Sequence, residues 1–153
     1  LSGTYNFSSC SIQSKPSDIS DPEIAGISLG QTLVSQGNNI VVNIQASDDV
    51  SGVRSVSIFA GGPSDVTATT AGHNESASTY SSNNGLFQPT LSIDDYDEIG
   101  EWTITMITVT DNSGKSRYYN YRPSVNPNYY QYYSGSAYYD SSLPILKFNV
   151  TEN

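Results

Sequence analysis

The chain has 153 residues, with 15 acidic against 6 basic side chains and a formal net charge of −9. This length suits one domain and excludes a multidomain enzyme. The negative charge, with no basic run, makes nucleic acid and anionic membranes poor partners. No apolar stretch approaches the ~20 residues of a membrane span, so we expect no membrane insertion. Abundant Ser, Thr and Asn, 12 Tyr and few helix-forming residues favour an all-β protein.

Residues 1–22 are polar and contain Pro16 and Pro22, which predicts an extended N-terminal arm or linker. Tyr5 and Phe7 have the spacing of a strand and are followed by Ile12. With these side chains the arm could add as a donated strand to a neighbouring copy, and such head-to-tail contacts would propagate into a filament. The alternatives are a linker that folds back and the tail of a preceding repeat.

From residue 23 onward the apolar pattern changes to a period of two, which predicts half-buried strands. A change of parity near Thr105 and Met106 indicates a β-bulge, and the run Asn83-Asn84-Gly85 predicts a tight hairpin turn. The predicted strands lie at 40–46, 56–60, 65–70, 86–93, 102–109, 115–121 and 144–150. Such short strands favour a two-sheet antiparallel β-sandwich over 23–153. We expect its core to contain Ile40, Val42, Ile44, Val56, Ile58, Trp102, Ile104, Ile107 and Val109.

A tyrosine-rich insertion at about 122–143 interrupts this pattern and is predicted to be a long loop, although it could hide another hairpin. Tyrosine rings can stack on sugar faces while Asn and Ser make hydrogen bonds, so the insertion could bind carbohydrate. Alternatively, the rings cover a sheet edge or a subunit contact. The residues predicted to contact a ligand or a subunit are Tyr129, Tyr130, Tyr132, Tyr133, Tyr138 and Tyr139.

Three short motifs occur in a fixed order around the predicted strands: DDVSGV at 48–53, YDEIGEWTI at 96–104 and TDNSGK at 110–115. Their order resembles that of the bacterial immunoglobulin-like and cadherin-like modules of secreted multidomain proteins. The resemblance covers about residues 21–121 and 143–151. It implies an immunoglobulin-like sandwich, an extracellular or cell-surface location, and a role as a spacer, adhesin repeat or accessory domain. The tyrosine-rich insertion departs from the family's pattern.

In an immunoglobulin-like topology, the start of the first strand and two of the loops meet at one end of the sandwich. Hard oxygen ligands that converge there suit Ca²⁺, the candidate cofactor, which takes six to eight oxygens. The predicted ligands are Asp21, Glu23, Asp48, Asp49, Asp111 and Asn112. The alternative is that these residues only form turns through Asx hydrogen bonds. A second acidic group is expected to form a solvated corner at the opposite pole: Asp94, Asp95, Asp97, Glu98 and Glu101.

The chain has one cysteine, Cys10, and one histidine, His73, and neither can be assigned to a catalytic arrangement, so we expect no enzyme. Asn6, Asn74 and Asn149 fit the N-glycosylation pattern. The sequence therefore predicts a non-catalytic extracellular building block of a surface adhesin or filament. It would work through contacts with neighbouring copies or adjacent domains and could be stiffened by calcium. The alternative is a carbohydrate-binding accessory module that recognises glycans through the tyrosine-rich insertion.

Overall fold

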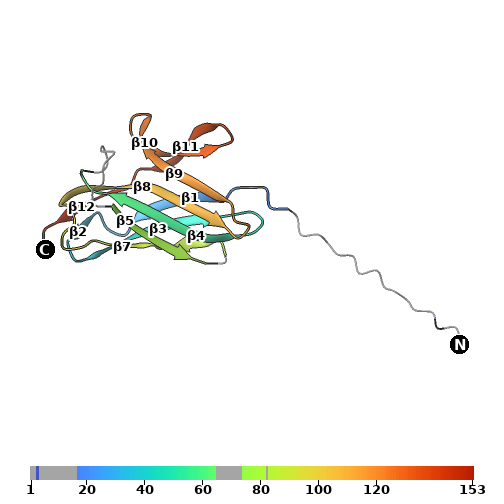
Figure 1. Cartoon of the computed structure of the whole chain (residues 1–153), viewed down its shortest axis with the longest axis horizontal. Helices are drawn as coiled ribbons and strands as arrows, with labels where there is room; N and C mark the ends of the chain where they lie inside the picture. Colours follow the sequence, from blue (N-terminus) through green and yellow to red (C-terminus); the bar gives the residue numbers. More distant parts are fainter. Residues whose placement is uncertain (1–2, 4–16, 65–73, 82) are drawn as a thin grey trace.

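The computed structural model describes residue 3 and residues 17–64, 74–81 and 83–153. Within these ranges the chain is all-β and forms two multi-stranded sheets, as predicted for a β-sandwich (Figure 1). The described part contains no helix long and apolar enough to cross a membrane. The strands are β1 (Glu23–Leu29), β2 (Leu33–Ser35), β3 (Asn39–Ser47), β4 (Val53–Gly61), β5 (Asn74–Tyr80), β6 (Gly85–Phe87), β7 (Thr90–Ser92), β8 (Gly100–Asp111), β9 (Ser116–Arg122), β10 (Asn126–Ser134), β11 (Ala137–Pro144) and β12 (Lys147–Thr151).

The smaller sheet is built on β3, which pairs with β1 on one side and with β6 and β7 on the other. β1 begins at Glu23, where the alternating pattern of the sequence also begins. The predicted arm is described only at residue 3 and residues 17–22, so its donor residues Tyr5, Phe7 and Ile12 lie outside the described ranges. Cys10, His73, Asn6 and the predicted strand at 65–70 also lie outside them.

The larger sheet is built on β8, whose long edge is shared by two partners. β9 pairs with residues 106–110 of β8, and β12 pairs with residues 100–103. β4 pairs along the other side of β8 and carries β5 at its outer edge. The predicted all-antiparallel pairing is wrong at one place, because β2 pairs with β12 in parallel. The chain reaches this position because it leaves the smaller sheet after β1 and joins the larger sheet at β2.

The core lies between the two sheets, and every predicted core residue is completely buried. Trp102 stacks on Phe148 with ring centroids 6.1 Å apart, and its indole N–H donates to the carbonyl of Glu98 at 2.7 Å. The predicted bulge is confirmed, since Phe59 opposes Met106 while Ala60 opposes Ile104, which leaves Thr105 unpaired with β4.

The turn predicted at 83–85 is not a hairpin turn. It connects β5 in the larger sheet to β6 in the smaller one, and Gly85 has the positive φ of 144° that this crossing uses. The amide side chain of Asn84 accepts from the N–H groups of Asp48 and Val53 and donates to the carbonyl of Asp48. Asn84 therefore fixes the β3–β4 loop instead of closing a two-strand ribbon.

The second acidic group is more ordered than a solvated corner. Asp97 is 3% exposed and accepts from the Asp94 amide at 2.7 Å. The Glu98 carboxylate accepts from the amide and hydroxyl of Ser64, and Glu101 pairs with Lys147 at 3.0 Å. Asp97 and Glu98 thus hold the loop before β8, and Asp97 is buried there, whereas Glu101 is an exposed residue of β8 that pairs this strand with β12.

The tyrosine-rich insertion is a β-hairpin and not a loop. β10 and β11 are joined by the two-residue turn Gly135-Ser136, where Gly135 has φ of 64°. β10 also pairs with β9, so the hairpin extends the larger sheet, and Figure 1 shows it standing at the top of the sandwich. Tyr130 points into the core, where its hydroxyl donates to the Ile104 carbonyl at 2.8 Å and accepts from the Leu146 amide at 3.1 Å.

Candidate functional site

The β3–β4 loop is organised by the side chain of Asp48. Its Oδ2 accepts from the amides of Val50, Ser51 and Gly52 at 3.1, 2.7 and 3.1 Å, and from the Ser51 hydroxyl at 3.1 Å. Burial opposes ionisation of Asp48, but these hydrogen bonds outweigh it, so the pKa of the carboxyl lies below its usual value. Asp48 is therefore a charged group that is only 6% exposed.

Asp18, Asp48 and Asp49 form a cluster of three carboxylates, which we call the acidic triad. One oxygen from each lies within 4.8 Å of the others. Both carboxylate oxygens of Asp18 and the Oδ1 of Asp48 are buried and have no hydrogen-bond partner within the described ranges. Carboxylates this close repel one another, so a triad without donors on these oxygens has the electrostatics of a cation site.

A cavity of about 390 Å³ adjoins the triad. The space exceeds what one ion needs, so water molecules or groups from a neighbouring module have room to complete a coordination shell. Ser20, which lies before β1, contacts the β3–β4 loop, because its hydroxyl donates to Asp49 at 3.2 Å. The cavity is lined by Ser20, Asp21, Glu23, Ser47, Asp48 and Asp49.

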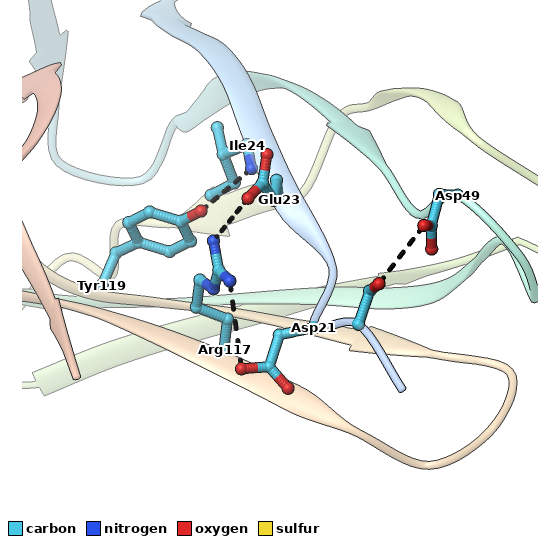
Figure 2. A network of polar contacts seen from close by, with 7 residues as sticks. Asp21, Glu23, Ile24, Asp49, Arg117 and Tyr119 are labelled. Atoms are coloured by element: carbon cyan, nitrogen blue, oxygen red, sulfur yellow. Dashed lines mark hydrogen bonds and ion pairs between the residues drawn. The ribbon is translucent and has the colours of Figure 1, made fainter. Parts of the chain in front are cut away.

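Asp21 and Glu23 were predicted as metal ligands, but the structure pairs both with Arg117 of β9 (Figure 2). The guanidinium lies 3.0 Å from Glu23 and 3.9 Å from Asp21. Beside this pair, the Tyr119 hydroxyl accepts from the Ile24 amide at 3.0 Å. These contacts hold the start of β1 against β9, while the same two acids also line the cavity.

Asp111 and Asn112, the last two predicted ligands, are used in the β8–β9 turn. The Oδ1 of Asp111 accepts from the Lys115 amide at 2.9 Å and the Ser113 hydroxyl at 2.8 Å. The Asn112 side chain donates to the carbonyls of Ser51 and Gly52. Asn112 thus ties this turn to the β3–β4 loop, and neither residue belongs to the acidic triad.

Sequence reasoning therefore identified two members of the triad and missed the third, Asp18. Asp18 lies in the polar stretch before β1, which we call the incoming segment (residues 17–22). Asp18 could have been found from the sequence, because it is an acid only three residues before Asp21, a predicted ligand at the end of the sandwich where calcium was expected.

The predicted contact tyrosines fall into two groups. Tyr130 is completely buried, so its ring is not available to a ligand, and the prediction for this residue is wrong. Tyr129, Tyr133, Tyr138 and Tyr139 are about half exposed, and Tyr132 is partly buried. Because Tyr132 opposes both Tyr119 and Tyr139, these three rings share one face of the sheet, and Tyr133 and Tyr138 share the other.

Two of the predicted glycosylation sites are on strands. Asn149 lies on β12 and is exposed, while Asn74 is the first residue of β5.

Comparison of the sequence with protein-family models gives no match, and no similar sequence is found among curated proteins.

Proposed function

We propose that this chain is a non-catalytic extracellular building block of a surface protein or filament, and that Ca²⁺ fixes its incoming segment to the sandwich. The acidic triad carries the proposal. Asp18 belongs to the chain that arrives from outside the sandwich, whereas Asp48 and Asp49 belong to the β3–β4 loop. A cation bound to all three would join the segment to the loop and stiffen the junction with whatever precedes it.

The residues of the triad fit a hard divalent cation. Carboxylate oxygens are the ligands that Ca²⁺ prefers, and its flexible coordination tolerates water in the remaining positions. Asp48 brings a second advantage, because its Oδ2 is fixed by three amides and its Oδ1 remains free of hydrogen bonds within the described ranges. The ligand is thus held in place before any ion binds, which lowers the entropic cost of binding.

The arrangement of the triad also explains why an ion would act on the junction. Without a cation, the charge on Asp18 is repelled by two carboxylates on the neighbouring loop. The incoming segment would then depend on the exposed contact between Ser20 and Asp49 and on the pairing of Asp21 with Arg117. A bound Ca²⁺ would replace the repulsion between these carboxylates by attraction to the ion. The incoming segment would then be fixed to the sandwich.

The test is thermal unfolding in 10 mM Ca²⁺ and in chelator. Extracellular modules bind Ca²⁺ with Kd of about 10⁻⁴ to 10⁻³ M, which corresponds to roughly 1–3 kcal/mol of stabilisation at this concentration. For a domain of this size we expect Tm to rise by roughly 3–10 °C. The same amount of Mg²⁺ should give a smaller rise, since Mg²⁺ gives up its water reluctantly.

The decisive variant is Asp18→Asn, with Asp95→Asn as the matched control. Asp95 is an exposed acid in the loop before the start of β8. The β3–β4 loop of the triad instead contacts the turn that follows the end of β8, through Asn112. Asp18→Asn should abolish the rise in Ca²⁺ and, by removing repulsion, should raise Tm slightly in chelator. Asp95→Asn should leave the Ca²⁺ effect intact. No rise in the unmodified chain, or a rise that survives Asp18→Asn, would overturn the proposal.

The building-block role is tested separately by the mass of the chain in solution. Light scattering in Ca²⁺ and in chelator, for the whole chain and for a form that lacks residues 1–16, separates the two modes of contact. Assemblies that disappear with the deletion would support strand donation by the arm. Assemblies that disappear only in chelator would support contacts through the cation site. A monomer under every condition would contradict assembly of isolated copies and leave tandem linkage within a longer chain as the only form of the proposal.

A further inference from the structure

The larger sheet has a long edge strand, β5, which among the described strands pairs only with β4. It lies on the side of this sheet away from the hairpin β10–β11 (Figure 1). Its seven residues follow β4 without a register shift and include no proline, and its one charged residue, Glu75, is close to its start. Unpaired backbone groups on such an edge are a template for another strand, so soluble proteins usually shorten, bulge or charge their edge strands. β5 is neither short nor bulged, and residues 76–80 carry no charge.

The other edges of the two sheets have these protective features. β2, β6 and β7 have three residues each. β1 has a register shift after Ile24, whose amide donates to the Tyr119 hydroxyl of β9. β11 contains Asp140 and Pro144, and its register with β10 shifts between them, where Ser142 has φ of 60°. Among the described strands, β5 is therefore the edge best suited to accept a further strand.

The pairing of β4 with β5 shows which backbone groups of β5 face outward. The Ser81 amide donates to the Arg54 carbonyl at 2.9 Å, and this pair continues the β4–β5 register. In an antiparallel ladder, hydrogen-bonded and non-hydrogen-bonded pairs alternate. The backbone groups of residues 75, 77 and 79 therefore bond to β4. Those that point away from β4, toward a strand that could be added, belong to Ser76, Ser78 and Tyr80.

The outer face of β5 also has room for large side chains. Ser76 and Ser78 are small and exposed, and Tyr80, on the same face, is 74% exposed. Phe59 of β4 lies opposite Ser76 and is 39% exposed. Opposed residues in a sheet share a face, so the two rings flank the small serines. A strand added beside β5 could place aromatic side chains against Tyr80 and over the serines.

We propose that β5 accepts the N-terminal arm of a second copy of this chain as an added strand. The arm is long enough, because residues 1–16 would span roughly 50 Å when extended, whereas the seven residues of β5 span roughly 23 Å. Tyr5 and Phe7 are two residues apart, so they would lie on one face of the added strand. That face can be the one on which Phe59 and Tyr80 are exposed.

Charge favours the arm over the β5 strand of a second copy. Residues 1–14 contain no charged side chain, so the arm can reach β5 without bringing two acidic sandwiches together. Pairing β5 with β5 would instead press together two chains that each have a net charge of −9. Each copy would have one donor arm and one acceptor edge, so copies would add head to tail. This inference rests on the proposed building-block role and names the contact through which copies would assemble.

The test is the mass in solution, measured in chelator so that the cation site does not contribute, over a series of protein concentrations. Ser78→Pro removes an N–H that points away from β4, so it should block the edge and keep the β4–β5 pairing. Ser78→Ala is the matched control, because it loses the hydroxyl contact with Ser57 but keeps the amide. A third form lacks residues 1–16 and keeps every described strand. Melting curves show whether each form is folded, and Ser76→Pro, at the other outward-facing serine, replaces Ser78→Pro if that variant does not fold.

We expect the unmodified chain and Ser78→Ala to assemble alike, and Ser78→Pro to assemble at least about tenfold more weakly. The form without residues 1–16 should remain monomeric. A mixture of this form with Ser78→Pro should give a complex with one copy of each, because one supplies the edge and the other supplies the arm.

Three results would overturn the inference and leave the building-block role intact: assembly of Ser78→Pro as strong as that of the unmodified chain, assembly of the form without residues 1–16 on its own, or no complex in the mixture. A monomeric unmodified chain would also overturn it. The rise of Tm in Ca²⁺ tests the calcium proposal independently of all four results.

Discussion

The hydroxyl of Tyr130 bridges a gap in the hydrogen-bond ladder of the larger sheet. Removing this one atom should therefore lower the free energy of unfolding by more than the loss of a single hydrogen bond. β8 changes partner from β9 to β12 near Ile104, where the ladder of either strand alone would be interrupted. The Ile104 amide bonds to the Leu146 carbonyl. The remaining carbonyl of Ile104 and amide of Leu146 both bond to the Tyr130 hydroxyl.

Tyr130→Phe keeps the ring and removes both of these bonds. Each backbone group left buried without a partner costs about 1–3 kcal/mol, and both are in a region where Ile104 is fully buried and Leu146 is 8% exposed. We therefore expect the free energy of unfolding to fall by roughly 2–4 kcal/mol. For a domain of about this length, the loss corresponds to a decrease in Tm of roughly 5–15 °C.

Urea unfolding followed by Trp102 fluorescence measures this change, and Tyr133→Phe is the control. The control removes a hydroxyl from a half-exposed ring of the same strand and should change stability by less than about 0.5 kcal/mol. A shift of the midpoint at constant slope would show that only stability changed. If Tyr130→Phe costs no more than the control, then water or backbone movement satisfies both groups, and the explanation of the partner change is wrong.

Three further predictions use the same unfolding measurements. Burial raises the pKa of Tyr130 above its ordinary value of about 10. The unfolded chain therefore releases this proton at lower pH than the folded chain, so stability that is present below about pH 10 is lost as the pH rises further. Tyr130→Phe should make this alkaline loss of stability smaller, and an unchanged loss would contradict the prediction. Asn84→Ala should cost roughly 1–3 kcal/mol through its three loop bonds, whereas a similar cost for Asn83→Ala would refute this role. The one tryptophan, Trp102, should be shielded from acrylamide until the chain unfolds, and quenching in the native state would show that the sheets open locally.

The core could be predicted from sequence because it rests on a simple physical periodicity. Residues such as Ile40, Val42 and Ile44 alternate with polar neighbours, and a strand with one buried face requires that alternation. The bulge at Thr105 was visible for the same reason, since it is the point where the alternation changes parity. Neither feature depends on distant parts of the chain.

The hairpin was mispredicted because tyrosine removes the contrast on which that periodicity relies. Tyr132 and Tyr133 point to opposite faces of β10, and each has a ring that packs and a hydroxyl that tolerates water. Apolar and polar positions therefore do not alternate, and Asn126, Pro127 and Gly135 suggest a loop. The strand identity of this segment comes from its pairing with β9, which a local pattern does not contain.

The acidic triad could be predicted only in part, for a similar reason. Asp48 and Asp49 follow a strand directly, so their place at one end of the sandwich was determined by the strand. Asp18 approaches them from a segment without a repeating pattern, and its position depends on the path of the chain before β1. Arg117 also could not be placed from local sequence, since its partner Glu23 lies 94 residues away and Asp21 lies beside Glu23 in the chain.

The parallel pairing of β2 with β12 determines how the sandwich would respond to mechanical force. In tandem modules tension would enter each domain through β1 and leave it through β12. Beyond β1 it would reach β2 and pull β2 and β12 in opposite directions along their common axis. Parallel strands loaded in this way must lose their hydrogen bonds together, whereas a hairpin such as β10–β11 would open one bond at a time. The β10–β11 hairpin lies at the edge of the larger sheet, beyond β9, and would bear little of the load. Within the larger sheet, a fibre built from this domain would thus carry tension through β2 and β12 and would leave the β10–β11 hairpin undisturbed while the chain is stretched.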